Sequence, residues 1–457
     1  MNKFDEKYGS QSMRVNVRPE IIKDNNYVYY SIFQPNEQAP NFYRSLFRYI
    51  IKIFHPIRLK FIARNIKRPF YNRVEPLRHV LFFPVTNNNN RVLEPIWSNL
   101  QEGTCSILTF DNREDYIPSN LVSVYSILNI FALISLYIQS NPRERLIIRT
   151  YFDEFFSVAG YIKVYDKLLS HSDVRLIILA NDHSVLTRAL FHVAERKGIK
   201  TIYLQHCSVT EKFPKLRFDY CFLDGEESLL KYLQAGKPSG RVYLSGNPRF
   251  DAMVKCKVKQ RSNQKNIGIA LSDLDNEEDI RNFFIVMLKH GFQHLTVRPH
   301  PAAKFDSTWY EEHGIAYSNS KVENPFEFVS RMDIVIAGES GIHLDAAMMN
   351  VRSICYDISN TIPGDYYSYI KNGLVPYAAS IEELFALIEN EDADLYEGRQ
   401  MKARWYNAAY GTQYEGHIGE MIADFIRHEQ NNDIEGFDQK YKFENKNING
   451  VNVRELK

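Results

Sequence analysis

The 457-residue sequence predicts an α/β protein with two parallel sheets, each in its own domain. Short apolar runs alternate with helix-length segments, which is the pattern of parallel strands covered by helices on both faces. This alternation occurs twice, and a polar, lysine-rich stretch at 256–266 separates the two series. Hydrophobic residues make up 44% and charged residues 24%, which is typical of a globular chain and excludes a disordered or coiled-coil protein.

Six candidate strands make up the first series. Each is a run of four to seven mainly apolar residues between polar or turn-forming positions. The segment 184–197 has the length of a helix and is followed by Gly198, which is typical of a helix C-terminus. The candidate strands are 79–85, 145–150, 174–180, 200–205, 220–223 and 242–245.

The second series follows the polar stretch and ends in helices. Its candidate strands are 267–271, 295–298, 334–337 and 353–356, and its candidate helices are 278–290, 382–389 and one or two within 397–427. Beyond Arg427 the chain is polar and rich in asparagine, so we expect a mobile tail.

These segments predict two Rossmann-like domains that face each other across a cleft. The ligands of open parallel sheets bind beyond the carboxyl ends of the strands, so we expect the site in that cleft. The predicted parts are an N-terminal extension at 1–75, a first domain at 76–255, a second domain at 256–396, terminal helices at 397–427 that cross back, and a polar tail at 428–457.

The N-terminal extension contains a strongly basic segment. Residues 1–40 are polar, and we expect them to be weakly structured, but 38–74 carries nine basic residues and no acidic one, interleaved with aromatic and aliphatic residues. Two interpretations are open. In the first, the segment is a helical pair, broken at Pro56, whose apolar side packs on the protein. In the second, which the interleaved basic and apolar residues favour, 42–73 contacts an anionic membrane surface.

Other features exclude several classes of protein. The formal net charge is +1, which argues against a protein that coats nucleic acid. The five cysteines are widely spaced without a C-x-x-C pair, so we expect neither structural zinc nor disulfides, and a cytosolic location. The N-terminus lacks the apolar core of a secretory signal. The apolar run 125–138 is shorter than the roughly 20 residues of a spanning helix, so we expect a buried core helix.

Two candidate bases follow strands of the first domain. His206 comes directly after the strand 200–205, and a histidine has a pKa suited to removing a proton from a substrate hydroxyl. Phosphate binding and a purely structural role are the alternatives for His206. Asp224 follows the strand 220–223 and is the second candidate base, although an Asp-Gly turn is the plain alternative.

Two further residues of the first domain have open roles. Asp182 either caps the following helix, as Ser184 would, or serves to bind the acceptor or to orient another catalytic group. Arg249, in the motif GNPRFD, either pairs with Asp251 or reaches toward a ligand.

The second domain carries motifs suited to phosphate. Arg298 and His300 lie in the sequence RPHP, where two prolines hold the loop and both side chains can donate to a phosphate. The turn GESG, formed by Gly338, Glu339, Ser340 and Gly341, opens a helix; its N–H groups and hydroxyl suit an anion, and Glu339 a sugar hydroxyl. Ser272 is a further phosphate candidate, and Asp273 with Asp275 is more simply a solvated loop than a metal site.

Taken in order, QHC, GNPRFD, RPHP and GESG resemble motifs of GT-B glycosyltransferases of bacterial surface-polysaccharide synthesis. The order is similar to that of the CDP-glycerol polymerases of teichoic acid synthesis, and the motif types are similar to those of GT-B sialyltransferases. The resemblance covers roughly 78–427. Cys207 stands where the polymerases have glycine, GESG replaces a double serine, and LDG has one acidic residue where sialyltransferases have two.

The resemblance implies a transferase that moves a sugar from a nucleotide-activated donor to a hydroxyl of a surface polysaccharide or lipid-linked glycan. The first domain would bind the acceptor, with His206 as base, and the second would bind a CMP-, CDP- or UDP-linked donor without a metal or another cofactor. We expect the protein in the cytoplasm, peripheral on the inner face of the bacterial plasma membrane. The alternatives are a CDP-polyol phosphotransferase, a sugar-nucleotide epimerase and a non-catalytic glycan- or membrane-binding protein.

Overall fold

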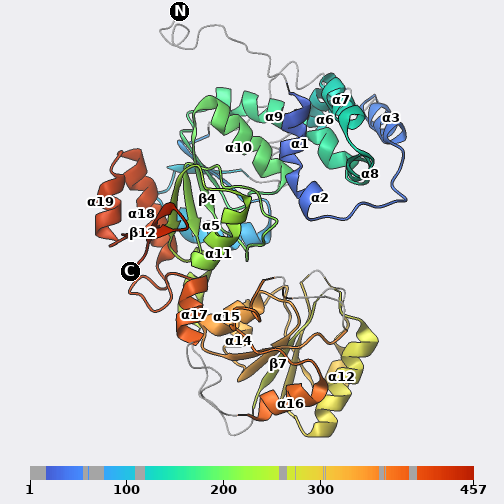
Figure 1. Ribbon diagram of the computed structural model, residues 1–457, viewed down its shortest axis with the longest axis vertical. Coiled ribbons are helices and arrows are strands. Elements are labelled where there is room, and N and C mark those ends of the chain that lie inside the picture. The colour runs from blue at the N-terminus through green and yellow to red at the C-terminus, as the bar shows by residue number, and fades with distance from the viewer. Residues whose placement is uncertain are drawn as a thin grey trace, which may run out of the picture. The chain divides into compact units, whose positions relative to one another are not determined.

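The computed structural model describes residues 17–54, 60, 77–108, 119–256, 265–272, 274–301, 303, 305–359, 365, 367–390 and 399–457. The chain divides into two compact units, whose helices and strands are labelled in Figure 1. Unit 1 contains residues up to 89, 100–203 and 212–219, and unit 2 contains 90–99, 204–211 and 220–457. The domain bounds that we draw from the sequence stay predictions.

Unit 1 contains four parallel strands of the larger sheet, in the order β4-β3-β1-β2. In β1, Val80 lies opposite Leu176 on one side and Cys105 on the other. Every residue of β1 and β3 is buried, because helices cover both faces of a parallel sheet. The strands are β1 (Val80–Phe83), β2 (Cys105–Ile107), β3 (Leu176–Leu179) and β4 (Lys200–Leu204).

Helices surround these strands, and two of them occupy the N-terminal region that we expected to be weakly structured. That expectation is wrong for 19–31, where Ile22 and Val28 are 1% and 4% exposed, and residues 1–16 lie outside the described part. The helices are α1 (Pro19–Asn25), α2 (Tyr27–Ser31), α3 (Phe42–Ile53), α6 (Ser119–Leu128), α7 (Ile130–Gln139), α8 (Pro142–Thr150), α9 (Phe152–Ser170) and α10 (Val185–Lys197), with α5 (Asn87–Trp97) reaching into unit 2.

The segment 145–150, predicted as a strand, is the second part of helix α8. A capping box starts this helix: the Asn141 side chain accepts from the Glu144 N–H at 2.9 Å, and Glu144 accepts from the Asn141 N–H at 3.1 Å. Pro142 occupies the first helical position, which also favours a helix. The apolar run that suggested a strand is the buried side of this helix, because short apolar runs do not distinguish the two structures.

The apolar run 125–138 is divided between two helices, so the prediction of one buried core helix is wrong. Helices α6 and α7 meet at Asn129 with a bend of 62°. Leu133 and Leu136 are buried, whereas Leu128 and Phe131 at the bend are 69% and 81% exposed. In the described part of the chain no single helix is long and apolar enough to cross a membrane, although α6 and α7 together meet that length and composition.

Unit 2 contains the other four strands of the larger sheet, in the order β12-β13-β6-β5, and the whole of a second sheet. The second sheet is parallel throughout and has the order β11-β10-β7-β8-β9. Parallel strands joined by helices confirm the α/β class. The strands are β5 (Tyr220–Leu223), β6 (Arg241–Leu244), β7 (Ile267–Ala270), β8 (Leu295–Arg298), β9 (Ala316–Tyr317), β10 (Ile334–Ala337), β11 (Arg352–Cys355), β12 (Glu444–Ile448) and β13 (Val451–Glu455).

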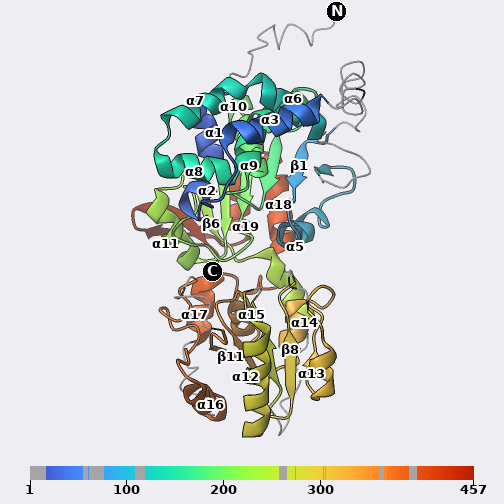
Figure 2. The same cartoon turned by 90° about the vertical axis from the view of Figure 1, so that its right-hand side faces the viewer.

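Both faces of the second sheet are covered by helices. Alternate residues of β10 belong to two different hydrophobic clusters: Ile334 and Ile336 pack with α12, and Val335 and Ala337 pack with α14 and α15. In the view of Figure 2, α12 lies in front of the sheet. The helices of unit 2 are α11 (Glu226–Ala235), a 3₁₀ helix (Pro248–Lys255), α12 (Glu277–His290), α13 (Thr308–Glu312), α14 (Pro325–Val329), α15 (Ile342–Met348), α16 (Ile381–Glu389), α17 (Arg399–Tyr406), α18 (Ile418–Gln430) and α19 (Ile434–Lys440).

The C-terminal residues are ordered structure, so the expectation of a mobile tail is wrong. Helix α19 is followed by the hairpin β12–β13, and β13 adds to β6 in parallel, with Val453 opposite Val242. Asn449 and Gly450 form the two-residue turn with φ of +49° and +76°, as an Asn-Gly hairpin requires. The Asn-Gly dipeptide is a sequence signal for a hairpin, but the flanking strands are polar and lack the alternating apolar residues that normally accompany it.

Candidate active site

The carboxyl ends of strands in unit 2 carry a network of buried polar side chains. Gln205, which follows β4, accepts a hydrogen bond from the Asp224 N–H at 3.0 Å and donates to the carbonyl oxygen of Cys207 at 2.9 Å. His206, between Gln205 and Cys207 in the chain, is 8% exposed, and its Nε2 lies 3.4 Å from the Cys207 Sγ. The structure therefore holds both candidate bases, His206 and Asp224, beside one glutamine.

Asp224 is 3% exposed and forms a hydrogen bond with a buried amide. Asn247 donates from Nδ2 to the Asp224 carboxylate at 2.8 Å and to the Gln205 carbonyl at 2.7 Å. Burial raises the pKa of Asp224 to about 7, against the lowering effect of Arg249 and of the Asn247 hydrogen bond. A carboxyl group that titrates near neutrality can both accept and donate a proton.

The Asp-Gly pair at 224–225 is more than a turn. Gly225 has an extended backbone, and a Cβ atom there would lie 2.3 Å from the carbonyl oxygen of Trp405, just before the end of α17. The Asp224 carbonyl accepts the Ala408 N–H at 2.7 Å. The glycine is required for this close approach, which packs the segment after α17 against the end of β5.

Arg249 pairs with Asp345 and not with Asp251. Its Nη1 lies 3.4 Å from the Asp345 carboxylate, and its guanidinium lies over the Phe250 ring at 4.3 Å. Asp251 instead accepts the N–H groups at the start of α18, at 3.0 and 2.7 Å. Of the two interpretations of Arg249, the pairing with Asp251 is wrong.

The charge of Arg249 is fixed by two carboxylates. Burial alone would lower the pKa of its guanidinium, but Asp345 and then Asp224 raise it. Its Nε is buried and has no hydrogen-bond partner among the residues that the structure describes. Buried N–H donors of this kind usually have a partner, so this donor is an exception within unit 2.

Asp345 is a site residue that the sequence reasoning did not single out. Burial raises the pKa of its carboxyl, and Arg249, Arg91 and Arg298 oppose that rise in this order. Three arginines from separate segments of unit 2 therefore act on one carboxylate. The sequence signal was weak, because Asp345 is a single acid inside the first turn of a short helix.

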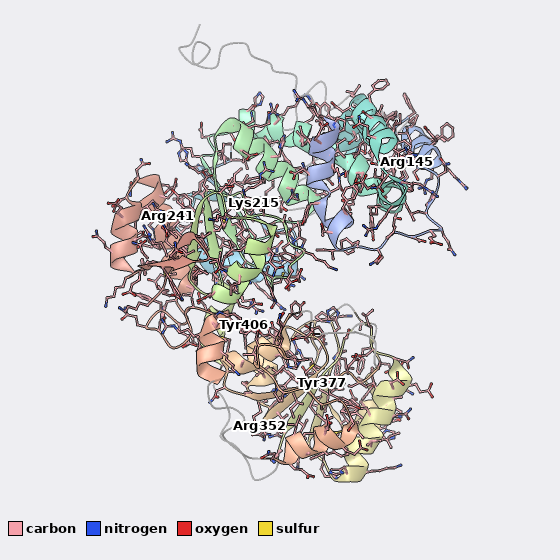
Figure 3. The ribbon with its side chains drawn as sticks, viewed as in Figure 1. Arg145, Lys215, Arg241, Arg352, Tyr377 and Tyr406 are labelled. Carbon is pink, nitrogen blue, oxygen red and sulfur yellow. The ribbon has the colours of Figure 1, made fainter. Side chains whose placement is uncertain are left out.

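A second buried ion pair lies beside this network. The Lys231 ammonium and Glu227 carboxylate of α11 are 2.5 Å apart, with side chains 8% and 4% exposed. Lys231 also donates to the Tyr367 carbonyl at 3.0 Å, and the Tyr369 and Ser208 hydroxyls are 2.6 Å apart. Tyr406, labelled in Figure 3, donates to the Ser368 carbonyl at 3.1 Å. These contacts hold the loop around 367–369 against α11 and α17.

The glycine turn before α15 is partly exposed, but its side chains have local partners. The Glu339 carboxylate accepts the Tyr367 N–H at 2.7 Å, and the Ser340 hydroxyl accepts the Ile342 N–H at 3.4 Å. Gly338 accepts from the His343 ring at 2.9 Å, and the space where a Cβ of Gly341 would lie is open. Helix α15 has seven residues, so the anion-binding role of this turn stays a prediction.

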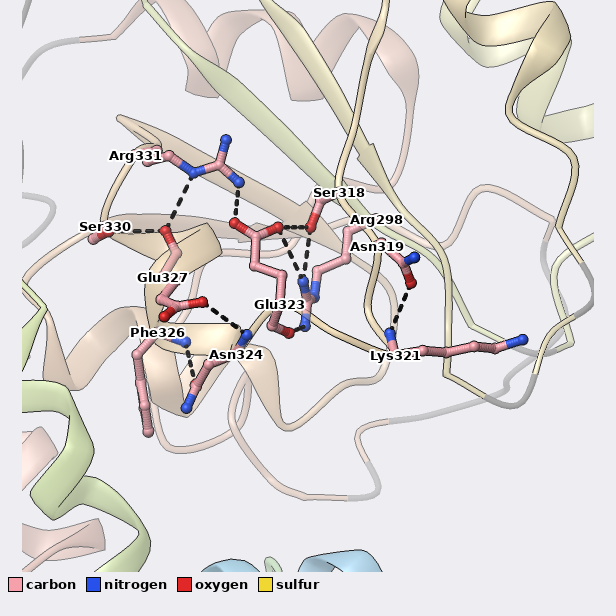
Figure 4. A network of polar contacts seen from close by, with 10 residues as sticks. All are labelled: Arg298, Ser318, Asn319, Lys321, Glu323, Asn324, Phe326, Glu327, Ser330 and Arg331. Carbon is pink, nitrogen blue, oxygen red and sulfur yellow. Dashed lines mark hydrogen bonds and ion pairs between the residues drawn. The ribbon is translucent and has the colours of Figure 1, made fainter.

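Arg298 holds a loop of its own unit (Figure 4). It is 5% exposed, and it donates to the Ser318 hydroxyl at 2.7 Å and to the Glu323 carbonyl at 2.9 Å. Its guanidinium also lies 3.6 Å from the Glu323 carboxylate, which pairs with Arg331. Burial lowers the pKa of Arg298. His300, two residues on, is exposed, and phosphate binding by both residues stays a prediction.

The remaining candidates lie apart from these contacts. The Ser272 hydroxyl accepts the Leu274 N–H at 3.2 Å, and its own N–H donates to Asp275 at 2.6 Å. Asp273 lies outside the described residues. Within the described ranges no group of three or more His, Cys, Asp or Glu residues could hold a metal ion, and metal independence stays a prediction.

Asp182 belongs to unit 1, where it pairs with the ring of His183 at 2.9 Å. The loop before α10 is closed by Asn181, whose side chain accepts from the N–H groups of His183 and Ser184 at 3.0 and 2.7 Å. The prediction that Asp182 or Ser184 caps this helix is therefore wrong: Asn181 makes the side-chain hydrogen bonds before α10, and Ser184 makes no side-chain cap. A catalytic role for Asp182 stays a prediction.

No protein-family model and no curated protein matches the sequence. The chain is similar in structure to the wall teichoic acid polymerase TagF, with 14% identity, a TM-score of 0.49, and coverage of 86% of this chain and 99% of the other. It is also similar to UDP-GlcNAc 2-epimerase from Neisseria meningitidis, with 15% identity, a TM-score of 0.48, and coverage of 76% of this chain and 98% of the other. The glycotransferase of kitacinnamycin is similar with 10% identity, a TM-score of 0.48, and coverage of 78% of this chain and 99% of the other. A teichoic acid polymerase and a glycotransferase are thus among the proteins of similar structure, and the motifs of this chain resemble those of such enzymes.

Proposed function

We propose that the chain is a glycosyltransferase that moves a sugar from a nucleotide-activated donor to a hydroxyl of a surface polysaccharide or lipid-linked glycan. The observation that carries the proposal is the buried polar network after β4, β5 and β6. It combines His206 with Asp224, a carboxyl whose pKa is about 7, and with the cation Arg249. Sugar transfer needs a base for the acceptor hydroxyl and positive charge for the departing phosphate.

In the proposed reaction, His206 removes the proton of the acceptor hydroxyl as its oxygen attacks the anomeric carbon of the donor. The bond between that carbon and the phosphate oxygen breaks, and the nucleotide leaves with the electron pair. A base in this position typically contributes about 10²- to 10⁴-fold in rate. Asp224, protonated or ionised at neutral pH, is placed to exchange a proton with the same network.

The departing nucleotide gains negative charge, and arginines suit it. Arg249 and Arg91 both act on Asp345, and Arg91 is exposed. Their charges favour a phosphate in this part of unit 2, and His300, on the loop after β8, can donate a ring N–H to a phosphate. Without a ligand, Asp345 partly neutralises this positive charge.

A sugar-nucleotide epimerase is a second candidate function, and the buried carboxyl of Asp224 is the observation that favours it. Epimerisation removes a proton from carbon and returns it on the other face, and a buried carboxyl with a pKa of about 7 suits both steps. An epimerase converts its nucleotide sugar without an acceptor. A phosphotransferase that uses a CDP-polyol would instead leave a phosphodiester in its product.

The first experiment is a thermal-shift screen of the full chain against CMP, CDP, UDP and GDP. Stabilisation by one of them selects the donor, since a ligand that binds only the folded state raises the melting temperature. The matching nucleotide sugars are then incubated with and without glycan acceptors, and the products are weighed. A glycoside supports the proposal; a phosphodiester, or an epimer formed without acceptor, overturns it. Stabilisation by none of the four removes the donor site.

Matched variants assign the roles. His206→Ala is expected to lower kcat at least 100-fold with donor affinity kept, whereas His294→Ala, an exposed histidine of the same unit, is expected to behave as wild type. Asp224→Asn is compared with the exposed Asp306→Asn. His300→Ala is expected to weaken donor binding, and wild-type turnover and donor affinity in that variant would contradict its phosphate role.

A further inference from the structure

Helix α3 of unit 1 has three distinct faces. The first packs on the protein: Phe42 stacks on Tyr137 at 4.4 Å and Tyr49 contacts Phe156 at 4.3 Å between ring centroids. Phe42 and Ile53 are 1% and 8% exposed. The helix is therefore docked firmly, against α6 and α8 among others (Figure 1).

The second face of α3 is apolar and open to solvent. Its residues follow one another at spacings of four, four and three positions, and the last directly follows the end of the helix, so they form one row. Large hydrophobic side chains are rarely exposed in such a row, because burial of each would gain about 1.5–3 kcal/mol. The row consists of Tyr43, Phe47, Ile51 and Phe54, which are 61%, 61%, 57% and 65% exposed.

The third face of α3 is basic and lies beside the apolar row. Arg44, Arg48 and Lys52 each follow a residue of that row by one position, and all three are exposed. None of them has an ion pair with another residue that the structure describes. An exposed apolar row flanked by a cationic row is the pattern of a helix that lies in the surface of an anionic bilayer.

A second exposed apolar site lies at the bend between α6 and α7. Helix α6 packs against α3, and the bend between α6 and α7 exposes Leu128 and Phe131 at 69% and 81%. Of the 13 large hydrophobic residues that are exposed in the described chain, eight lie in these N-terminal helices and the short loop after α2. Exposed apolar side chains are thus concentrated in one region.

We propose that the exposed rows of α3 dock the protein on an anionic membrane surface, with the apolar row inserted among the lipids and the basic row on the headgroups. Within 42–73, the proposal concerns α3 and Phe54, because 55–59 and 61–73 lie outside the described residues. The docking surface is separate from the network in unit 2, so it stands whatever reaction that network performs.

Flotation of the full chain with vesicles tests the proposal. Wild type is expected to float with mixed phosphatidylcholine–phosphatidylglycerol vesicles, and much less with phosphatidylcholine alone or at high salt. Arg44→Gln with Arg48→Gln and Lys52→Gln is expected to weaken binding to the mixed vesicles on the order of 100-fold. Phe47→Ser with Ile51→Ser is expected to weaken it about 10-fold or more.

Controls come from exposed residues of unit 2. Lys289→Gln with Lys321→Gln and Lys371→Gln removes the same charge, and Val286→Ser with Val322→Ser removes exposed apolar side chains that are 40% and 84% exposed. Both control variants are expected to float as wild type does. Melting temperatures of all variants show that the fold is kept.

Insertion of position 47 into the bilayer can be measured directly in the Phe47→Trp variant. The fluorescence emission of its new indole is expected to shift to the blue when mixed vesicles are added. Wild type that does not bind mixed vesicles overturns the proposal. So does equal loss of binding in the control variants, or wild-type binding by the Phe47→Ser, Ile51→Ser protein. A concentration-dependent dimer that these two substitutions abolish, without vesicle binding, would assign the row to a second copy of the chain.

Discussion

Arg249 and Asp345 form an ion pair at 3.4 Å between the 3₁₀ helix after β6 and the helix after β10. Both side chains are largely buried, at 20% and 8% exposed. Asp224 acts on the same guanidinium, so one cation serves two carboxylates in the interior of unit 2. The pair links the 3₁₀ helix that follows a strand of the larger sheet to α15, which follows a strand of the second sheet.

Arg249→Met is expected to destabilise the protein by about 3–5 kcal/mol, because it leaves a buried carboxylate without its cation. The double variant Arg249→Met, Asp345→Asn is expected to recover part of this loss. Urea denaturation measures both. Arg281→Met, which removes an exposed ion pair with Glu277, is the control and is expected to cost less than about 1 kcal/mol. Equal costs for Arg249→Met and Arg281→Met would show that the buried pair adds nothing.

Asp224 gives the stability a defined pH dependence. Its pKa is about 7 in the folded chain and about 3.9 in an unfolded one. The folded state therefore binds more protons between these values, so the stability that Asp224 contributes is complete below pH ~4 and is lost as the pH rises through 7. The window follows from burial, which raises the pKa.

Relative to Asp224→Asn, wild type is expected to lose up to about 1.4 kcal/mol of unfolding free energy per pH unit in that window. The comparison cancels groups that both proteins share, such as Glu144, whose lowered pKa acts in the opposite direction. Urea titrations at several pH values provide the measurement. Parallel curves for wild type and Asp224→Asn would mean that the carboxyl of Asp224 keeps an ordinary pKa.

Much of this fold is predictable because its strands are buried. Strands such as β7 and β10 read as continuous apolar runs, and the polar residues after β4, β5 and β6 follow directly from them. The partners of those residues are not predictable in the same way. Asp345 lies inside a helix that looks ordinary in sequence, and its role arises only when packing places it beside Arg249. Lys231 pairs with Glu227 at i,i+4 spacing on α11, which the sequence does offer, but the burial of this pair and its contact with Tyr367 come from packing.

The C-terminal hairpin shows a second limit. Its strands are polar at most positions, so the composition indicates a solvated tail, yet Ile448, Val453 and Leu456 are 5%, 0% and 0% exposed. A few apolar residues at the right register are enough when a strand completes the edge of an existing sheet. Local composition carries no information about that edge.

Leu456→Ala tests whether this hairpin belongs to the core. The substitution is expected to lower the unfolding free energy by about 2–5 kcal/mol, because it leaves a cavity beside β6. The control is Leu274→Ala, whose side chain is 59% exposed and whose expected effect is within about 0.5 kcal/mol. Similar values for the two would contradict a buried C-terminal strand.

Arg298→Lys separates the structural contacts of Arg298 from its predicted role in phosphate binding. Lysine keeps the charge, but it cannot make both the Ser318 and the Glu323 contacts with the geometry of a guanidinium. The expected result is a loss of about 1–3 kcal/mol of stability without any nucleotide. Denaturation of the ligand-free protein measures it.

The matched control is Arg331→Lys, since Arg331 is 39% exposed and pairs with the same Glu323. Its expected cost is below about 1 kcal/mol, because water replaces the lost contact. If Arg298→Lys leaves the ligand-free stability unchanged but weakens nucleotide binding, Arg298 serves the ligand and not its loop. If Arg298→Lys lowers the stability but keeps the nucleotide affinity of wild type, the Arg298 guanidinium positions the loop after β9. The phosphate must then be bound by other cations.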